Sequence, residues 1–132
     1  MVLLMAAVML SVPSLAVEVI AHPKVAAQNL PINTARSIFG MRQLTWPDGQ
    51  QVRVFVFSDN HPLHNEFCKE MLNMYPYQLR QSWDRLIYSG TGQAPMEVNS
   101  EEEMLSRVSG TPGAIGYVRK VNSNAVRTIN IR

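Results

Sequence analysis

The stretch Val52–Phe57, with the sequence VRVFVF, constrains the fold of this chain more than any other segment. Five of its six residues are apolar, so a strand formed by them would present apolar side chains on both of its faces. Such strands are typical of layered α/β sheets, in which helices cover both sides of the sheet. The stretch therefore predicts a central strand that is covered on both faces.

Segments around this strand predict alternating helices and strands. Apolar residues spaced three and four apart predict one helix that begins near Pro62 and another that begins at Pro76. A further helix is predicted at the capping sequence Ser100–Glu103, because the serine hydroxyl can accept a helical N–H and the glutamate can reach back. Other strands are predicted at Val17–Ala21, Ala114–Val118 and Ala125–Arg132. Strands separated by helices predict an α/β domain.

Capping residues mark where the helices begin and end. Asn33 or Thr34 is the expected cap of a short helix that ends at Gly40. Asp59 or Asn60 is the expected cap of the next helix. In both cases a short polar side chain would accept a hydrogen bond from a free helical N–H group.

Glycine and proline mark the turns. Trp46–Gly49, with the sequence WPDG, predicts a tight turn, because proline presets φ and glycine tolerates a left-handed conformation. Gly110 is expected just past a helix at positive φ, and Pro112 with Gly113 then turns the chain. Gly116, inside the following strand, predicts a bulge or the close approach of another backbone.

Length and composition indicate one globular domain. The chain has 132 residues, of which 46% are hydrophobic and 17% are charged. The formal net charge of +2 is too weak, and the basic residues are too scattered, to predict nucleic-acid binding. Cys68 is the single cysteine, which excludes an internal disulfide.

The first sixteen residues, MVLLMAAVMLSVPSLA, carry no charged side chain. Their apolar run is shorter than the roughly 20 residues that span a bilayer. Ser14 and Ala16 provide the small residues that precede a cleavage site, so residues 1–16 are predicted to be a signal peptide and residues 17–132 the mature domain. No Lys or Arg precedes the apolar run, and a buried N-terminal strand or helix is the alternative. The signal peptide predicts a protein of the periplasm or a secreted one, with no membrane span in its mature part.

Several short motifs occur here in the order in which they occur in one known family. They are Ile38-Phe39-Gly40, Trp46-Pro47-Asp48-Gly49, Phe67, Met71-Leu72, Trp83, Gly90-Thr91-Gly92 and Pro112-Gly113-Ala114-Ile115-Gly116-Tyr117-Val118. The chain thereby resembles small periplasmic proteins similar to the phosphate-binding component of ABC transporters, within the type 2 periplasmic binding protein superfamily. The resemblance covers roughly Val19 to Val118.

This resemblance implies a single lobe of the periplasmic-binding-protein kind, in which a mixed central sheet is flanked by helices. Full-length members of the family have two lobes and trap an anion in the cleft between them. The chain is too short for two such lobes, so the resemblance implies one lobe that is completed by its own N-terminal strand. The other half of a cleft would be absent or supplied by another molecule.

The resemblance also implies where a ligand would bind. Phosphate-binding relatives have an Arg at the end of the central strand and then an Asp-Gly-Ser-Gly-Thr loop at a helix N-terminus. In this chain Asp59 matches that loop, whereas Phe57 takes the Arg position. His61, Pro62 and Leu63 take the last three loop positions, which removes the hydroxyls and one N–H group. The donors that remain near the helix N-terminus are Ser58, Asn60 and His61.

Two other groups of residues carry candidate chemistry. Ser89, Thr91 and Gly92 form a small-residue loop that could contact an anion, although a helix stop is the plainer interpretation. His64 and Cys68 share one helix face, a pattern that zinc or a nucleophilic thiol could use. We instead expect Cys68 to be a small buried hydrophobe and predict neither a metal nor a catalytic residue. Trp46, Trp83 and Tyr117 are likewise expected in the core or at its edge.

Two functions from different classes follow from these observations. The first is a non-enzymatic, periplasmic solute-binding-like protein for phosphate or a similar oxyanion, with Ser58, Asp59, Asn60, His61, Ser89, Thr91 and Gly92 as ligand-binding residues and no cofactor. The second is a ligand-free protein-interaction or accessory module of a membrane sensor or envelope complex. The sequence leaves both open.

Overall fold

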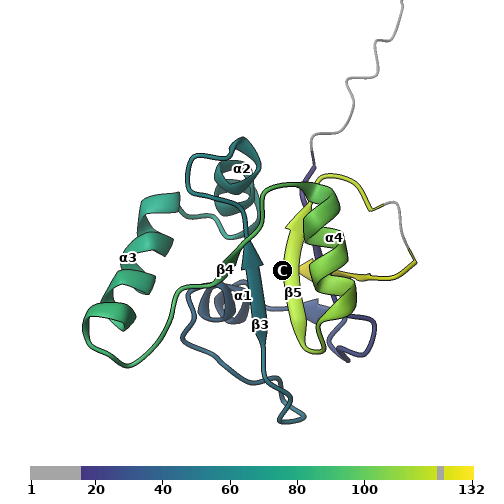
Figure 1. Cartoon of the computed structure of the whole chain (residues 1–132), viewed down its shortest axis with the longest axis horizontal. Coiled ribbons are helices and arrows are strands. Elements are labelled where there is room, and N and C mark those ends of the chain that lie inside the picture. The colour runs from purple at the N-terminus through teal and green to yellow at the C-terminus, as the bar shows by residue number, and fades with distance from the viewer. Residues whose placement is uncertain (1–15, 122–123) are drawn as a thin grey trace, which may run out of the picture.

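Six strands form one mixed sheet in the computed structural model, in the order β2-β6-β1-β5-β3-β4 (Figure 1). The structure describes residues 16–121 and 124–132, so the predicted signal peptide lies outside the described residues except for Ala16. The strands are β1 (Glu18–Ala21), β2 (Asn29–Leu30), β3 (Arg53–Val56), β4 (Met96–Glu97), β5 (Ala114–Val118) and β6 (Arg127–Ile131). The helices are α1 (Ile32–Phe39), α2 (Pro62–Met71), α3 (Pro76–Tyr88) and α4 (Glu101–Gly110).

The pairing of the strands confirms the predicted α/β fold and corrects the position of β3. β3 runs parallel to β5 on one side and to β4 on the other. β1 lies between β5 and β6 and is antiparallel to both, so the N-terminal strand is part of the sheet, as expected. β3 was expected at the centre, but it lies one strand in from the edge, because the two-residue β4 ends the sheet beside it.

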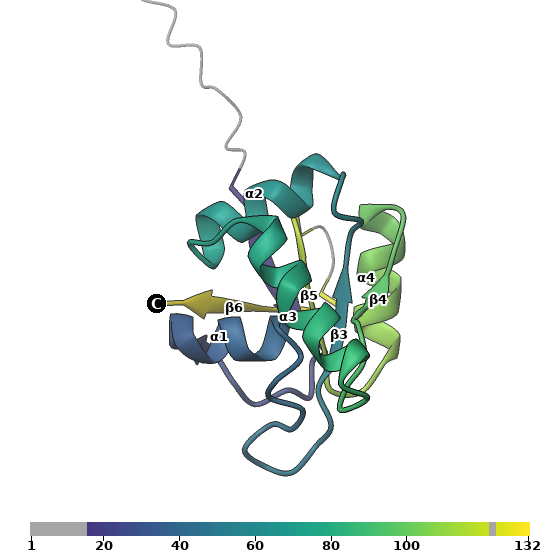
Figure 2. The same ribbon diagram turned by 90° about the vertical axis from the view of Figure 1, so that its left-hand side faces the viewer.

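Helices cover both faces of this sheet (Figure 2). α4 packs on the face formed by β5, β3 and β1, and α1 lies on the opposite face. α2 follows β3, and α3 contacts α2. Figures 1 and 2 together place α3 beside the β3 edge, away from α4. None of the described helices has the length and apolar character needed to cross a membrane.

Aromatic side chains fill the space between the sheet and α1, α2 and α3. The rings of Phe67 and Tyr117 stack with centroids 3.9 Å apart, and Phe39 meets the edge of Phe67 at 4.6 Å. Trp83 donates its indole N–H to the carbonyl oxygen of Phe39, and Trp46 donates to that of Gly113. The expected burial of both tryptophans and of Tyr117 is therefore confirmed.

Three details at the ends of helices differ from the expectations. α1 begins at Ile32, not at a cap on Asn33 or Thr34, and the Ile32 N–H donates to the carbonyl oxygen of Arg132. His61, not Asp59 or Asn60, caps α2. Gly110 is the last residue of α4, and the positive φ expected there belongs to Gly113, at +78°.

Gly116 is required by a side-chain contact and not by a bulge or by another backbone. The β1–β5 register runs without interruption through Ile20 and Gly116. A Cβ atom at Gly116 would lie 2.5 Å from the sulfur of Met104 and 3.2 Å from a methyl group of Val108, both on α4. The missing side chain therefore lets α4 sit directly on the sheet.

Candidate functional site

The carboxyl ends of β3, β4 and β5 meet at one edge of the sheet, because these three strands are parallel (Figure 1). In open α/β sheets ligands bind outside this edge. Ser58, Asp59, Asn60 and His61 lie here, between the end of β3 and the start of α2. Four of the predicted site residues are therefore brought together at a position suited to binding.

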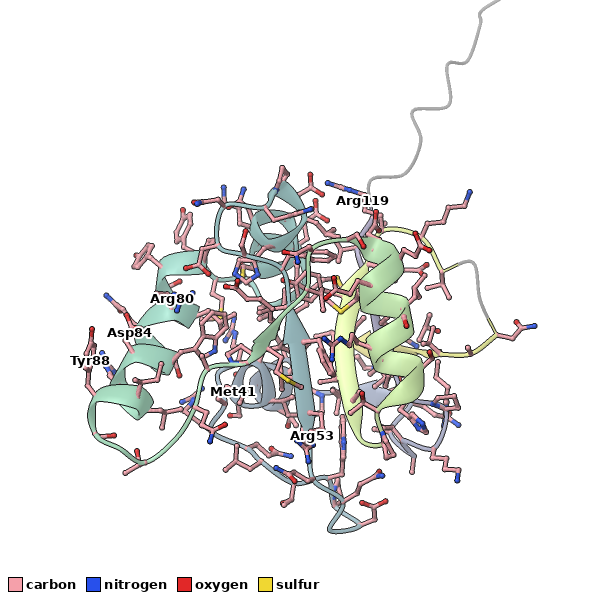
Figure 3. All side chains as sticks on the ribbon, viewed as in Figure 1. Met41, Arg53, Arg80, Asp84, Tyr88 and Arg119 are labelled. Atoms are coloured by element: carbon pink, nitrogen blue, oxygen red, sulfur yellow. The ribbon has the colours of Figure 1, made fainter. Side chains whose placement is uncertain are left out.

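Asp59 is held by an arginine that the sequence pattern did not identify. The Arg80 guanidinium donates to both carboxylate oxygens of Asp59, at 2.8 and 3.0 Å. This hydrogen-bonded pair lowers the pKa of Asp59 below its ordinary value, against the opposing effect of partial burial. Arg80 also lies over the Trp83 ring, at 4.9 Å from the centroid, and 4.0 Å from Asp84. Figure 3 shows Arg80, Asp84 and Tyr88 following one another along α3.

Arg80 thus supplies from α3 a guanidinium of the kind that the resemblance places at the end of the central strand, where this chain has Phe57. Its charge is matched within the chain by Asp59, with Asp84 nearby. Asp59 and Arg80 are 21 residues apart, and no sequence spacing announces such a pair.

The N-terminus of α2 is capped by its own loop. The Nδ1 atom of His61 accepts the N–H of Leu63 at 3.1 Å. The N–H groups of His64 and Asn65 donate to the carbonyl oxygen of His61, and Pro62 has no N–H group. The donors that hold anions at helix N-termini are therefore engaged within the chain or missing.

A buried series of neighbouring polar side chains lies directly beneath this loop. The Tyr117 hydroxyl accepts the N–H of Phe57 at 3.0 Å and lies 2.5 Å from Nδ1 of His64. Nδ1 is the acceptor within hydrogen-bond distance of the Tyr117 hydroxyl hydrogen among the described residues, so we assign the hydroxyl as the donor and the imidazole hydrogen to Nε2. Nε2 lies 3.6 Å from the sulfur of Cys68 and 4.0 Å from a carboxylate oxygen of Asp59. This series of polar side chains links β3, β5 and α2 at the end of the sheet.

Burial keeps the side chains of this polar series uncharged. It lowers the pKa of His64, with a smaller opposing effect from Asp59. It raises the pKa of the Cys68 thiol to about 12, so the thiolate needed for nucleophilic catalysis or metal binding does not form near neutral pH. The expected burial of Cys68 is confirmed, and the described residues contain no group of three or more potential metal ligands.

The lowered pKa of His64 predicts a loss of stability in mild acid. Its contribution is complete above the unfolded pKa of 6.5 and is lost as the pH falls from there towards the folded pKa, because the unfolded state binds the proton more readily. We expect the free energy of unfolding, measured in urea, to decrease between about pH 7 and about pH 5. The variant His64→Leu should lack this component of the decrease. The control His22→Gln should retain it, and an unchanged slope in His64→Leu would contradict the assignment.

A second ion pair lies further along the same edge. Arg119, just after β5, pairs with Glu66 of α2, and its backbone N–H donates to Glu101 of α4 at 2.6 Å. Figure 3 shows Arg119 at the upper end of β5, across the edge from Arg80. Both guanidinium groups at this edge are therefore engaged with carboxylates of the chain itself.

Ser89, Thr91 and Gly92 lie elsewhere, after the last turn of α3 (Figure 1). The N–H groups of Thr91 and Gly92 both donate to the carbonyl oxygen of Leu86, and the hydroxyls of Ser89 and Thr91 are 2.6 Å apart. This loop closes the C-terminal end of a helix, where the dipole favours cations. Arg80 is about 15 Å from it along the helix axis, so the structure does not unite the two predicted groups in one site.

Solved structures of proteins named for phosphate transport have a similar fold. A phosphate transport receptor of the ABC type from Vibrio cholerae superposes with a TM-score of 0.66 at 13% identity, over 87% of this chain and 45% of that one. PstS from Borrelia burgdorferi superposes with a TM-score of 0.65 at 14% identity, over 89% of this chain and 47% of that one. A Clostridium perfringens phosphate ABC transporter substrate-binding protein with bound phosphate gives 0.66 at 14% identity, over 87% and 44%.

These similarities define the class of fold. The chain has the fold of one lobe of these solved proteins and spans less than half of their length. At such low identity the likeness concerns the fold. No protein-family model matches the sequence, and no curated protein matches it significantly.

Proposed function

We propose that this chain is a non-enzymatic binding protein that contacts a partner protein, as an accessory module of a membrane sensor or envelope complex. The observation that carries the proposal is the closed loop at the end of β3. Asp59 is bound at both oxygens by Arg80, and His61 caps α2. A small anion would have to displace contacts that the chain already makes. Export through residues 1–16 remains part of this proposal.

The exposed side chains of α3 provide the surface for such a partner. The exposed fractions of Tyr77, Ile87 and Tyr88 are 60%, 45% and 87%. Tyr75, which immediately precedes α3, is 56% exposed, and its ring stacks on Tyr77 at 5.8 Å. Tyrosine and arginine are enriched at protein interfaces because they supply large contact area with polar tips. The exposed tyrosines of the described residues thus lie on α3 or immediately before it.

Oxyanion binding at Ser58–His61 is the second candidate, because one of the similar structures holds phosphate. The helix N-terminus is the remaining favourable feature at this position. A helix dipole contributes about 0.3–1 kcal/mol to an anion at an exposed terminus. Binding at millimolar affinity already requires about 4 kcal/mol, so further donors would be needed.

A thermal-shift series separates the two candidates. A ligand with a Kd of about 0.1 mM, present at about 10 mM, stabilises the folded state by about 2.7 kcal/mol, which raises the Tm of a domain of this size by several degrees. We expect phosphate and sulfate to raise the Tm by less than about 1 °C at that concentration, with sodium chloride of equal ionic strength as the control.

A rise of several degrees with phosphate, absent from the variant Arg80→Gln, would overturn the proposal. It would establish an oxyanion site at the end of β3. A rise that Arg80→Gln retains would place an anion site elsewhere and would also contradict a ligand-free module.

A further inference from the structure

A basic groove of about 310 Å³ lies between α1 and α3, away from the loop after β3 (Ser58–His61), which we call the β3 loop. Three arginines line it: Arg36 from α1, Arg42 from the segment after α1, and Arg85 from α3. Gln78, Gln81 and Ser82 add neutral polar groups from α3, and none of the described residues that line the groove is acidic. The groove therefore concentrates positive charge on a chain whose formal net charge is only +2.

The positive charge of the groove is not neutralised by the described part of the chain. Arg36 donates to neutral oxygens only, those of Leu72, Asn73 and the Asn33 side chain. Arg42 and Arg85 are exposed and form neither an ion pair nor a side-chain hydrogen bond with the residues that the structure describes. Arg80 and Arg119, by contrast, are each paired with a carboxylate.

The groove continues along α3 in both directions. It shares Met74 and Gln78 with a hollow lined by Tyr75 and Tyr77 at the start of the helix. It shares Gln81 and Arg85 with another hollow, lined by Asp84 and Tyr88 at the end of the helix. We name this continuous surface, from Tyr75 to Tyr88, the α3 trough. The three arginines line its middle, Lys69 joins the tyrosines at one end, and Asp84 lies beside Tyr88 at the other.

The length of the α3 trough distinguishes between ligands. A helix of 13 residues is about 20 Å long, several times the size of a single oxyanion. An extended peptide of about six residues covers the same distance. Carboxylates at its centre would face the arginines, and apolar or aromatic side chains at its ends would pack on the exposed tyrosines.

From this arrangement we infer that the α3 trough docks an extended acidic segment of a partner protein. The inference rests on the proposed interaction function and assigns its partner a chemistry: carboxylates in the middle and apolar side chains at both ends. Arg42 and Arg85 provide the free charges, because Arg36 is already fixed by carbonyl oxygens.

A synthetic peptide tests the inference directly. The probe is a fluorescein-labelled peptide of about ten residues with central glutamates flanked by leucine and tryptophan, and its binding to the whole chain is measured by fluorescence anisotropy at low salt. We expect saturable binding that weakens with salt, and little binding of the same peptide with glutamine in place of glutamate. The double variant Arg42→Glu/Arg85→Glu should weaken binding by about tenfold or more, since each reversal replaces attraction with repulsion.

A matched control separates the trough from net charge. Arg107, on α4 across the sheet, and Lys24 are exposed, and Lys24→Glu/Arg107→Glu changes the net charge by the same amount. The control should weaken binding by less than about twofold. Equal losses in both double variants, or equal binding of the glutamine peptide, would overturn the inference.

Tripolyphosphate is the competing polyanion. If it binds more tightly than the peptide and with the same dependence on Arg42 and Arg85, the groove is a small-ligand site and the docking inference fails. The proposed function fails separately through a phosphate effect that Arg42→Glu/Arg85→Glu retains, such as one that depends on Arg80. The two failures are distinguishable because Arg80 lies outside the residues that line the groove.

Discussion

Replacing Tyr117 with phenylalanine should reduce the free energy of unfolding by about 2–4 kcal/mol, although it removes a single oxygen atom. The loss follows from two groups at once. The Phe57 N–H loses its acceptor, and Nδ1 of His64 loses its donor, in a region from which water is excluded. Each buried polar group left without a partner costs about 1–3 kcal/mol. Urea unfolding of the two proteins measures the difference.

Tyr88→Phe is the matched control, because Tyr88 is 87% exposed and its hydroxyl makes no hydrogen bond with the described residues. It should change stability by less than about 0.5 kcal/mol. Adding His64→Leu to Tyr117→Phe should cost less than the sum of the single changes, because the second substitution removes a group that the first left unpaired. Strict additivity would contradict the direct hydrogen bond.

Gly113→Ala should reduce the free energy of unfolding by about 3 kcal/mol or more. Gly113 has a φ of +78°, and a Cβ there would lie 2.1 Å from the carbonyl oxygen of Gln51. The obstacle is backbone, so it can move only if the turn before β5 separates from the segment that leads into β3. The Gly113 carbonyl oxygen also accepts from Arg53 and from the Trp46 indole, and these bonds would be strained together.

Gly49→Ala separates the backbone collision from the cost of positive φ. Gly49 has a φ of +88°, but apart from the glycine itself and its two neighbours in the chain, no described residue has an atom within 4 Å of the position of its Cβ. It should therefore cost only about 1–2 kcal/mol, from the left-handed conformation alone. Urea unfolding measures both variants. If Gly113→Ala does not fold, its loss of the native circular dichroism signal beside a folded Gly49→Ala supports the same conclusion. Equal costs would contradict it.

The sequence predicted best the helices and strands that have a regular pattern of apolar residues. The apolar run Val52–Phe57 became β3, and the spacing of Leu63 and Phe67 gave the buried face of α2. These patterns are local, and packing supports them. The motifs on which the resemblance rested also led to the correct fold, because several of them lie at turns and buried contacts, such as the Trp46–Gly49 turn.

The capping and charge details depended on partners that are distant in sequence. Asp59 was expected to cap α2, but its carboxylate is taken by Arg80, and the imidazole of His61 caps the helix instead. The first N–H of α1 is satisfied by the carbonyl oxygen of Arg132, which is distant in the sequence. No spacing rule connects such pairs, because only the folded chain brings them together.

The grouping of the arginines in the groove could not be predicted from the sequence for the same reason. Arg85 is more than 40 residues from Arg36 and Arg42 in the sequence, and scattered basic residues gave no sign of a charged surface. Their grouping is a product of the way α3 packs beside α1. The fold also separates residues that the sequence analysis had assigned to one site: α3 keeps Ser89–Gly92 away from Ser58–His61.

The two-residue strands β2 and β4 end the sheet on both sides. An incoming chain would find only a short row of free amide and carbonyl groups at either border, too short to template a growing ribbon. Recruitment by strand addition is thus disfavoured, and concentrated protein should resist fibril formation. Any lasting association must rely on side chains and not on an extended ladder of backbone bonds.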